Sequence, residues 1–180
     1  MNTTAVEYEY DAILDSPLGR IGVQLHNRVI IRLDYLGDAA ALKSDTTPSG
    51  RQVATQLANY FGDPQHHFTL PVEPQGTDFQ RRVWLALTEI PCGETRTYSE
   101  LAAELGSGAR AVGNACRNNP LPIIIPCHRV ISVSGIGGYS GKTAGREINR
   151  KQWLLRHEGI AGPALKPGKN APFTGYHPHF

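Results

Sequence analysis

The hydrophobic periodicity of the sequence changes at a segment with three prolines, residues 62–76, and this change limits the folds open to the chain. Before it, apolar residues such as Ile21, Val23 and Leu25 alternate with smaller or polar ones, which is typical of short antiparallel strands. After it, apolar residues recur at helical spacing, as over residues 79–90. We therefore expect an α+β protein whose strands precede most of its helices.

The first part predicts a small antiparallel sheet. Strands are expected over residues 8–14, 21–25 and 29–36, with a turn at 16–19 and a hairpin turn at His26–Asn27. The apolar residues of the last strand are expected to share one face: Val29, Ile31 and Leu33. Residues 38–50 are polar and broken by a proline, so they are interpreted as a loop. Apolar residues at helical spacing then predict one helix that ends where the three-proline segment, interpreted as a linker, begins.

The second part predicts helices with clear starts. Capping boxes at Thr77 and Thr97 predict that helices begin there, because each threonine is followed three residues later by Gln or Glu. Glycines at 106 and 108 separate the second of these helices from another over residues 109–118, and this pair outlines a helix-turn-helix. The same outline is common in helical proteins that bind no nucleic acid.

The two parts differ in charge. Residues 1–78 carry 5 basic and 10 acidic side chains and residues 79–160 carry 11 and 6, although the formal net charge of the chain is only +2. A basic surface attracts polyanions such as nucleic acid. A chance imbalance between two solvated surfaces explains the numbers equally well, so charge alone points only weakly to nucleic acid.

The sequence shows neither a signal peptide nor an apolar run long enough to span a membrane. The three cysteines, Cys92, Cys116 and Cys127, cannot all pair. We therefore expect a protein without membrane association in a reducing compartment, the cytoplasm. In a bacterium it would lie with the nucleoid, and in a eukaryote in the nucleus.

Cys127 lies between Pro126 and the basic pair His128–Arg129. A cysteine after an apolar stretch is most often a small core residue, whereas a basic neighbour can activate it as a nucleophile. On a strand, adjacent side chains would face opposite sides, so this short motif alone leaves both interpretations open.

Residues 125–130, Ile-Pro-Cys-His-Arg-Val, resemble the active-site signature of the O6-alkylguanine-DNA alkyltransferases, a family of single-use DNA repair proteins. Further blocks resemble the same family in the same order: Gly76–Gln80, Ile90–Thr95, Arg110–Gly113, Asn119–Pro120, Tyr139–Gly141 and Trp153–Gly159. The resemblance is strong over about residues 74–160 and loose before them. It implies a ribonuclease H-like domain at 1–75, a catalytic domain with a winged-helix-like helix-turn-helix at 76–160, and a tail at 161–180.

In this family, the alkyl group moves from guanine O6 to the protein's own cysteine without a cofactor. This transfer is the reaction of a methylated-DNA–[protein]-cysteine S-methyltransferase. The resemblance implies that Cys127 accepts the alkyl group, that His128 deprotonates it through a bridging water, and that Glu158 orients the imidazole. Tyr98 would donate to guanine N3 as charge develops there, and Asn119 would hold the turn beside the site.

For the guanine itself, the resemblance implies contacts from Ser140 to O6 and from the carbonyls of Cys127 and Val130 to the exocyclic amine. Tyr139 and Pro122 would form apolar walls. The partner would be double-stranded DNA bound through its minor groove by a monomer, and Arg110 would replace the flipped nucleotide in the stack. The remaining expected DNA contacts are Thr97, Tyr98, Ala111, Gly113 and Arg117, with Arg81, Arg82 and Arg96 as further phosphate-contact candidates.

Some features depart from the family. Residues 1–78 contain no cysteine, so we expect no structural zinc. Cys116 is expected on the DNA-facing helix without an acceptor role, and residues 141–150 form a longer loop than usual.

Two other functions are also considered. A base-binding relative without transfer would carry tryptophan in place of Cys127, and a thiol hydrolase would use Cys127, His128 and Glu158 for many turnovers.

Overall fold

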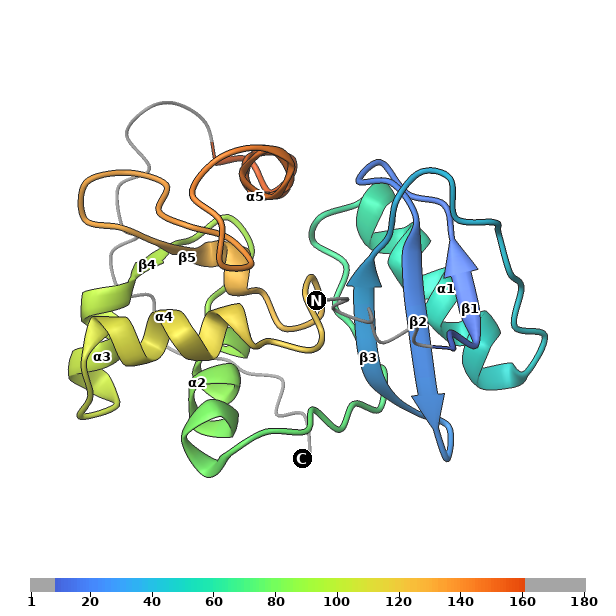
Figure 1. The fold of residues 1–180 in the computed structure, drawn as a ribbon, viewed down its shortest axis with the longest axis horizontal. Helices are drawn as coiled ribbons and strands as arrows, with labels where there is room; N and C mark the ends of the chain where they lie inside the picture. Colours follow the sequence, from blue (N-terminus) through green and yellow to red (C-terminus); the bar gives the residue numbers. More distant parts are fainter. Residues whose placement is uncertain (1–8, 161–180) are drawn as a thin grey trace, which may run out of the picture.

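The computed structural model describes residues 9–160 and shows a mixed α+β fold in two halves (Figure 1). One half holds a three-stranded antiparallel sheet with helix α1 behind it, and the other holds helices α2 to α5 around a short two-stranded sheet. The α+β class and the order of strands before helices agree with the prediction. The expected tail and its histidines lie outside the described residues.

The sheet has the order β1-β2-β3, with β1 over Ala12–Leu14, β2 over Ile21–His26 and β3 over Val29–Tyr35. The hairpin turn is Asn27–Arg28, one residue later than predicted. Both turn residues have positive φ, 49° and 68°, which is the twist that suits a two-residue hairpin.

A bulge changes which residues of β3 face the core. Leu25 pairs with Ile30 and Gln24 pairs with Arg32, so Ile31 is an extra residue between two pairs. The predicted face of Val29, Ile31 and Leu33 is therefore wrong. The fully buried residues of β3 are Ile30 and Leu33, because the bulge shifts the alternation by one residue.

Helix α1 spans Pro48–Gly62, so it begins inside the stretch that the sequence analysis interpreted as a loop. Thr47 caps this helix by accepting a hydrogen bond from the Gly50 amide, and Pro48 occupies the first turn. Proline suits that position because its missing N–H would have no helical partner there, so here it begins a helix.

The three-proline segment is partly attached to the sheet. Ile30 forms a parallel bridge with Val72, and Leu70 and Val72 are buried. Its first residues close the end of α1, and the segment then runs along the outer edge of β3 before α2 begins.

The second half is built from helices whose starts agree with the predicted caps. Helix α2 spans Asp78–Thr88 and α3 spans Tyr98–Glu104, and both begin with complete capping boxes. Helix α4 spans Ala109–Arg117 and α5 spans Arg146–His157. Strand β4, Arg96–Thr97, pairs in parallel with β5, Val130–Ile131.

Buried contacts fix the helix-turn-helix pair against the rest of this half. The indole N–H of Trp84 on α2 donates to the carbonyl of Ala115 on α4, at 2.9 Å. Gly106, with φ of +60°, makes the turn between α3 and α4. Helix α4 thus has one face against the core and one face in solvent.

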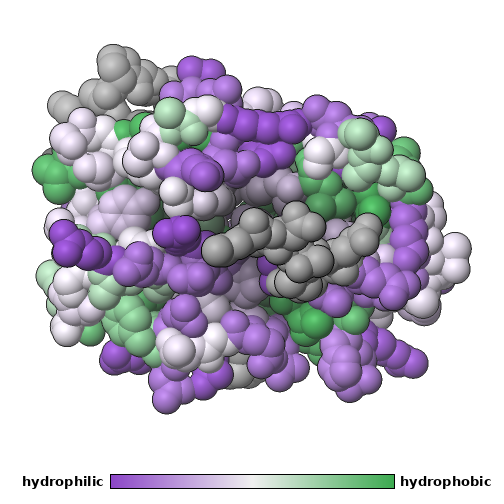
Figure 2. Space-filling view, viewed as in Figure 1, coloured by the Kyte–Doolittle hydropathy of each residue, from purple (hydrophilic) through white to green (hydrophobic). Residues whose placement is uncertain are grey.

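The two halves are joined by the main chain and by side chains. The Leu33 amide of β3 donates to the carbonyl of Pro120 at 2.8 Å, and Arg146 of α5 pairs with Asp38 at 2.6 Å. On the face in Figure 2, hydrophilic side chains lie over both halves and apolar groups form separate patches. Among residues 9–160, no helix combines the length and apolar character that membrane crossing requires.

Candidate active site

Cys127 lies in a short turn. A 3-10 helix over Cys127–Arg129 leads directly into β5, and the Cys127 amide donates to the Ile125 carbonyl at 2.8 Å. Because these residues form a helical turn and not a strand, the side chains of Cys127 and His128 need not face opposite sides. Cys127 is 5% exposed and His128 is fully buried.

Asn119 holds the backbone that leads to this turn. Its side-chain amide donates to the Ile125 carbonyl at 2.8 Å, and its side-chain oxygen accepts from the Leu121 amide at 3.0 Å. These two bonds close the loop before Cys127, which contains Ile123 at a positive φ of 75°. Asn119 thus bonds the backbone on both sides of this loop.

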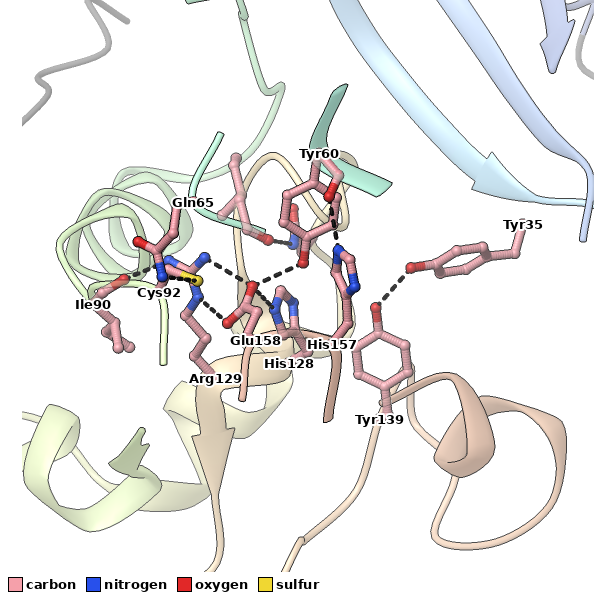
Figure 3. A network of polar contacts seen from close by, with 12 residues as sticks. Tyr35, Tyr60, Gln65, Ile90, Cys92, His128, Arg129, Tyr139, His157 and Glu158 are labelled. Carbon is pink, nitrogen blue, oxygen red and sulfur yellow. Dashed lines mark hydrogen bonds and ion pairs between the residues drawn. The ribbon is translucent and has the colours of Figure 1, made fainter. Parts of the chain in front are cut away.

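Glu158, at the C-terminal end of α5, is the centre of a buried network (Figure 3). Its Oε1 accepts from His128 Nε2 at 2.8 Å and from the Tyr60 hydroxyl at 2.8 Å. Arg129 donates to both carboxylate oxygens at 2.9 Å. Burial alone would raise the pKa of Glu158, but His128 and Arg129 outweigh it and hold that pKa far below its usual range.

The network leaves His128 neutral and able to accept a proton. Burial lowers the pKa of His128, and the attraction of Glu158 offsets this only in part because Arg129 already neutralises that carboxylate. A carboxylate only accepts hydrogen bonds, so the imidazole proton is on Nε2. Nδ1 is buried and has no hydrogen-bond partner among the described residues.

Lys151, on α5, is a buried cation near the thiol. It is fully buried, and its ammonium donates to the carbonyls of Val130 at 2.5 Å and Gly138 at 2.9 Å. Burial lowers its pKa to about 8, against the opposing effects of Cys127 and Cys116. Burial raises the pKa of the Cys127 thiol, while Asn119, Lys151 and Tyr139 act in the opposite direction. The thiol is thus protonated at rest and needs a base.

Cys127 opens into a cavity of about 250 Å³ between α3, α4 and the loop before α5. Its lining includes five of the predicted site residues: Tyr98, Gly113, Arg117, Tyr139 and Ser140. The hydroxyl of Tyr98 donates to the Gly138 carbonyl at 3.2 Å. Cys116 also lines this cavity and is buried, so it faces the site and not the outer surface of α4.

Other predicted residues lie outside this cavity. Pro122 lines a neighbouring cavity of about 440 Å³ that also contacts Asn119, Arg117 and Ser140. The carbonyl of Val130 already accepts from Lys151, and that of Cys127 accepts from the Val130 amide.

The predicted DNA-contact residues have different environments. Arg110 and Arg117 are exposed on α4, and Ala111 is half-buried. Thr97 is buried, and its hydroxyl is used in the cap of α3. Among the further phosphate-contact candidates, Arg81 pairs with Asp78, Arg96 pairs with Glu104, and Arg82 lies over the ring of Phe79.

Sequence reasoning missed three residues of the site: Arg129, Tyr60 and Lys151. Arg129 stands inside the recognised motif, so its adjacency to His128 was an available signal. Tyr60 comes from the other half of the chain, and Lys151 is one of several basic residues on α5, so no local pattern marks either of them. Among residues 9–160, no group of three or more His, Cys, Asp or Glu side chains is placed to hold a metal ion.

Comparisons with known proteins place these residues in a family. Residues 78–160 match the family model described as 6-O-methylguanine DNA methyltransferase, DNA binding domain. The methylated-DNA–protein-cysteine methyltransferase of Methanosarcina barkeri is 40% identical over 156 residues, which cover 83% of this chain and 96% of that protein. The protein of the same name from Mycobacterium bovis is 41% identical over 158 residues, with 84% and 93% covered.

Solved structures agree with this likeness across both halves. The crystal structure of Mycobacterium tuberculosis O6-methylguanine methyltransferase superposes with a TM-score of 0.70 at 39% identity, covering 84% of this chain and 93% of that one. A structure of Mycobacterium tuberculosis OGT in complex with DNA gives a TM-score of 0.67 at 39% identity, with 85% and 94% covered. With this similarity over most of its length, the chain belongs to the methylated-DNA–protein-cysteine methyltransferase family.

Proposed function

We propose that the chain repairs O6-alkylguanine in DNA by moving the alkyl group to Cys127 in a single-turnover reaction. In this reaction the bond between O6 and the alkyl carbon breaks as the sulfur–carbon bond forms. The electron pair of the broken bond stays on guanine. The main observation that supports the proposal is that the buried Cys127 is adjacent to a neutral His128. The Nε2 atom of this histidine is hydrogen-bonded to Glu158.

His128 prepares the nucleophile. Its Nδ1 takes the thiol proton through a bridging water, and Glu158 stabilises the imidazolium that results. Because Arg129 also donates to Glu158, the carboxylate stays ionised throughout.

The cavity beside Cys127 receives the flipped guanine. Tyr98 donates to N3 and Ser140 to O6, where negative charge appears as the alkyl group leaves. The carbonyls of Cys127 and Val130 accept from the exocyclic amine. Tyr139 forms one apolar wall of the base site, and Pro122, which lines the neighbouring cavity, forms another.

Helix α4 enters the minor groove with Arg110 in the place of the flipped nucleotide. Its close approach uses Ala111 and Gly113, and Arg117 binds phosphate together with the backbone at Thr97 and Tyr98. In this arrangement α3 and α4 are the helix-turn-helix of a winged-helix-like domain at 76–160, and residues 1–75 form a ribonuclease H-like domain. The protein acts as a monomer where the DNA is, in the cytoplasm of a bacterium or the nucleus of a eukaryote.

The test is transfer of label from a duplex with one O6-methylguanine labelled in its methyl group. We expect at most one label per protein, located on the Cys127 peptide by mass spectrometry and absent from Cys127→Ala. Repeated turnover would indicate a hydrolase, and binding of the duplex without transfer would indicate a base-binding protein. The same measurement with O4-methylthymine determines whether that base is also repaired.

A further inference from the structure

Two tyrosines that are far apart in the sequence meet beside the active site. Tyr35, the last residue of β3, and Tyr139, in the loop before α5, have hydroxyl oxygens 3.1 Å apart. Their ring centroids are 6.4 Å apart and the rings are tilted by 52°. Figure 3 shows the two hydroxyls facing each other, one from the strand and one from the loop. This contact links the sheet half of the molecule to the cavity.

Tyr35 is held in this position from several sides. Its backbone pairs with Ile21 at the end of the sheet. The guanidinium of Arg150 lies over its ring, 4.4 Å from the centroid, and is itself buried and bonded to the Leu18 carbonyl and to Glu147. A ring fixed by main-chain pairing and by a buried cation presents its hydroxyl in one direction.

Tyr139 connects this hydroxyl to the nucleophile. Tyr139 is 3% exposed and lines the same cavity as Cys127. Burial raises the pKa of the Cys127 thiol, and the hydroxyl of Tyr139 acts in the opposite direction. A hydroxyl has one proton to donate. If Tyr139 directs its proton at the sulfur, the hydrogen between the two tyrosines must come from Tyr35. In that arrangement the donors run in order from Tyr35 to Tyr139 to Cys127.

We infer that Tyr35 is a positioning residue for the reaction: its hydroxyl orients that of Tyr139 toward the sulfur of Cys127 and so stabilises the thiolate. The inference rests on the proposed function and gives the first half of the chain a part in the chemistry. Chains of hydrogen bonds strengthen one another in a buried site, so removing the outer donor weakens the inner bond. The titratable and charged groups that face the thiol or the two tyrosines are Tyr98, Cys116, Glu147, Arg150 and Lys151.

The test is the pH profile of Cys127 alkylation in Tyr35→Phe, which keeps the ring over Arg150 and removes only the hydroxyl. Iodoacetamide is the probe, with Cys127 modification counted by peptide mass, because this reagent needs a thiolate but no guanine site. We expect alkylation at pH 7 to slow by roughly 2- to 10-fold and the profile to move to higher pH by about 0.3–1 unit, the size of one hydrogen bond.

Two further variants locate the effect. Tyr139→Phe should shift the profile at least as much, and adding Tyr35→Phe to it should shift it no further, because the outer hydroxyl acts only through the inner one. Tyr10→Phe is the matched control: its hydroxyl donates to Asp34 at 2.9 Å on the same sheet, and its loss should leave the profile unchanged. An unshifted profile in folded Tyr35→Phe, or additive shifts in the double variant, would overturn the inference.

If Tyr35→Phe does not fold, 3-fluorotyrosine placed at position 35 gives the opposite test. A more acidic phenol is a stronger donor, so the profile should move to lower pH, and no shift would again overturn the inference. Reaction with O6-benzylguanine is measured beside iodoacetamide in every variant. A wild-type protein that reacts with iodoacetamide but not with O6-benzylguanine would contradict the proposed function, while the Tyr35 shift is still measured with iodoacetamide.

Discussion

Arg129 adds to the effect of burial in keeping the base, His128, neutral. Its two bonds to Glu158 supply the positive charge that the carboxylate would otherwise draw from His128. A histidine beside an uncompensated buried carboxylate would be protonated and unable to take a proton from the thiol. Arg129 thus keeps an ion pair and a neutral base in one buried site.

We predict that Arg129→Met raises the pKa of His128, because the charge of Glu158 then acts on the imidazole alone. Alkyl transfer from O6-benzylguanine near pH 6.5 should fall by roughly tenfold or more and recover in part as the pH rises. The pKa is measured by NMR titration of His128. Arg96→Met, which removes an exposed ion pair with Glu104, should change neither quantity. An unchanged His128 titration in Arg129→Met would contradict the assignment.

Only some of the residues of this site can be predicted from the sequence. Cys127 and His128 stand in a recognisable motif, so resemblance indicated both. Tyr60 and Lys151 contact the site only because α1 and α5 pack against the active-site turn. Such contacts depend on how elements pack, and a linear pattern of apolar and polar residues does not specify the partner of a single side chain.

At the scale of elements, α4 has separate inner and outer faces. Val112, Ala115 and Cys116 are buried against the core and the cavity, while Arg110 is exposed near its start. The exposed side chain of Arg110 is thus free of the contacts that hold the inner face, which is what the proposed insertion into DNA requires.

We predict that Arg110→Ala slows repair of O6-methylguanine in duplex DNA by roughly tenfold or more, because the flipped state costs a few kcal/mol that this side chain helps to offset. Its reaction with free O6-benzylguanine should stay within about twofold, since no nucleotide is flipped there. Single-turnover rates on both substrates test this, with Arg156→Ala, another exposed arginine of this half, as the control. Equal losses on both substrates would rule out the role.

Element boundaries were predictable where a side chain bonds its own backbone. The boxes at Thr77 and Thr97 fix the starts of α2 and α3 because both partners lie within four residues. The start of α1 was not predicted because of Pro48. Proline disrupts a helix when it lies in the interior but is favoured in the first turn, and the sequence does not show which position it occupies. The prediction of the core face of β3 was wrong because a bulge cannot be recognised from the pattern of apolar residues.

At the scale of the whole molecule, the buried His128–Glu158 pair makes folding depend on pH. The pKa of His128 is lowered in the folded state, so below about pH 6.5 the unfolded chain binds a proton that the folded chain does not. Glu158 has a lowered pKa as well, and its contribution is lost as the pH falls through that lowered value. Both groups therefore destabilise the fold in acid.

We predict that the free energy of unfolding decreases from pH 7 to pH 5, with His128 contributing at most about 1.4 kcal/mol per pH unit. Urea denaturation at pH 7, 6 and 5 measures it. His128→Asn should be less stable at pH 7 but show a smaller pH dependence over this range. His26→Asn, which changes an exposed histidine, should keep the wild-type slope. Equal slopes in all three proteins would show that His128 is not the group responsible.

The bulge in β3 has a consequence for how this chain can change. With the turn at Asn27–Arg28 fixed, deleting Ile31 would leave Gln24 opposite Arg32 and Val23 opposite Leu33, so the end of the strand at Tyr35 would keep its register. Ile31 is thus a spare position in the register, whereas deleting Leu33 would bring Asp34 opposite Val23 in the core.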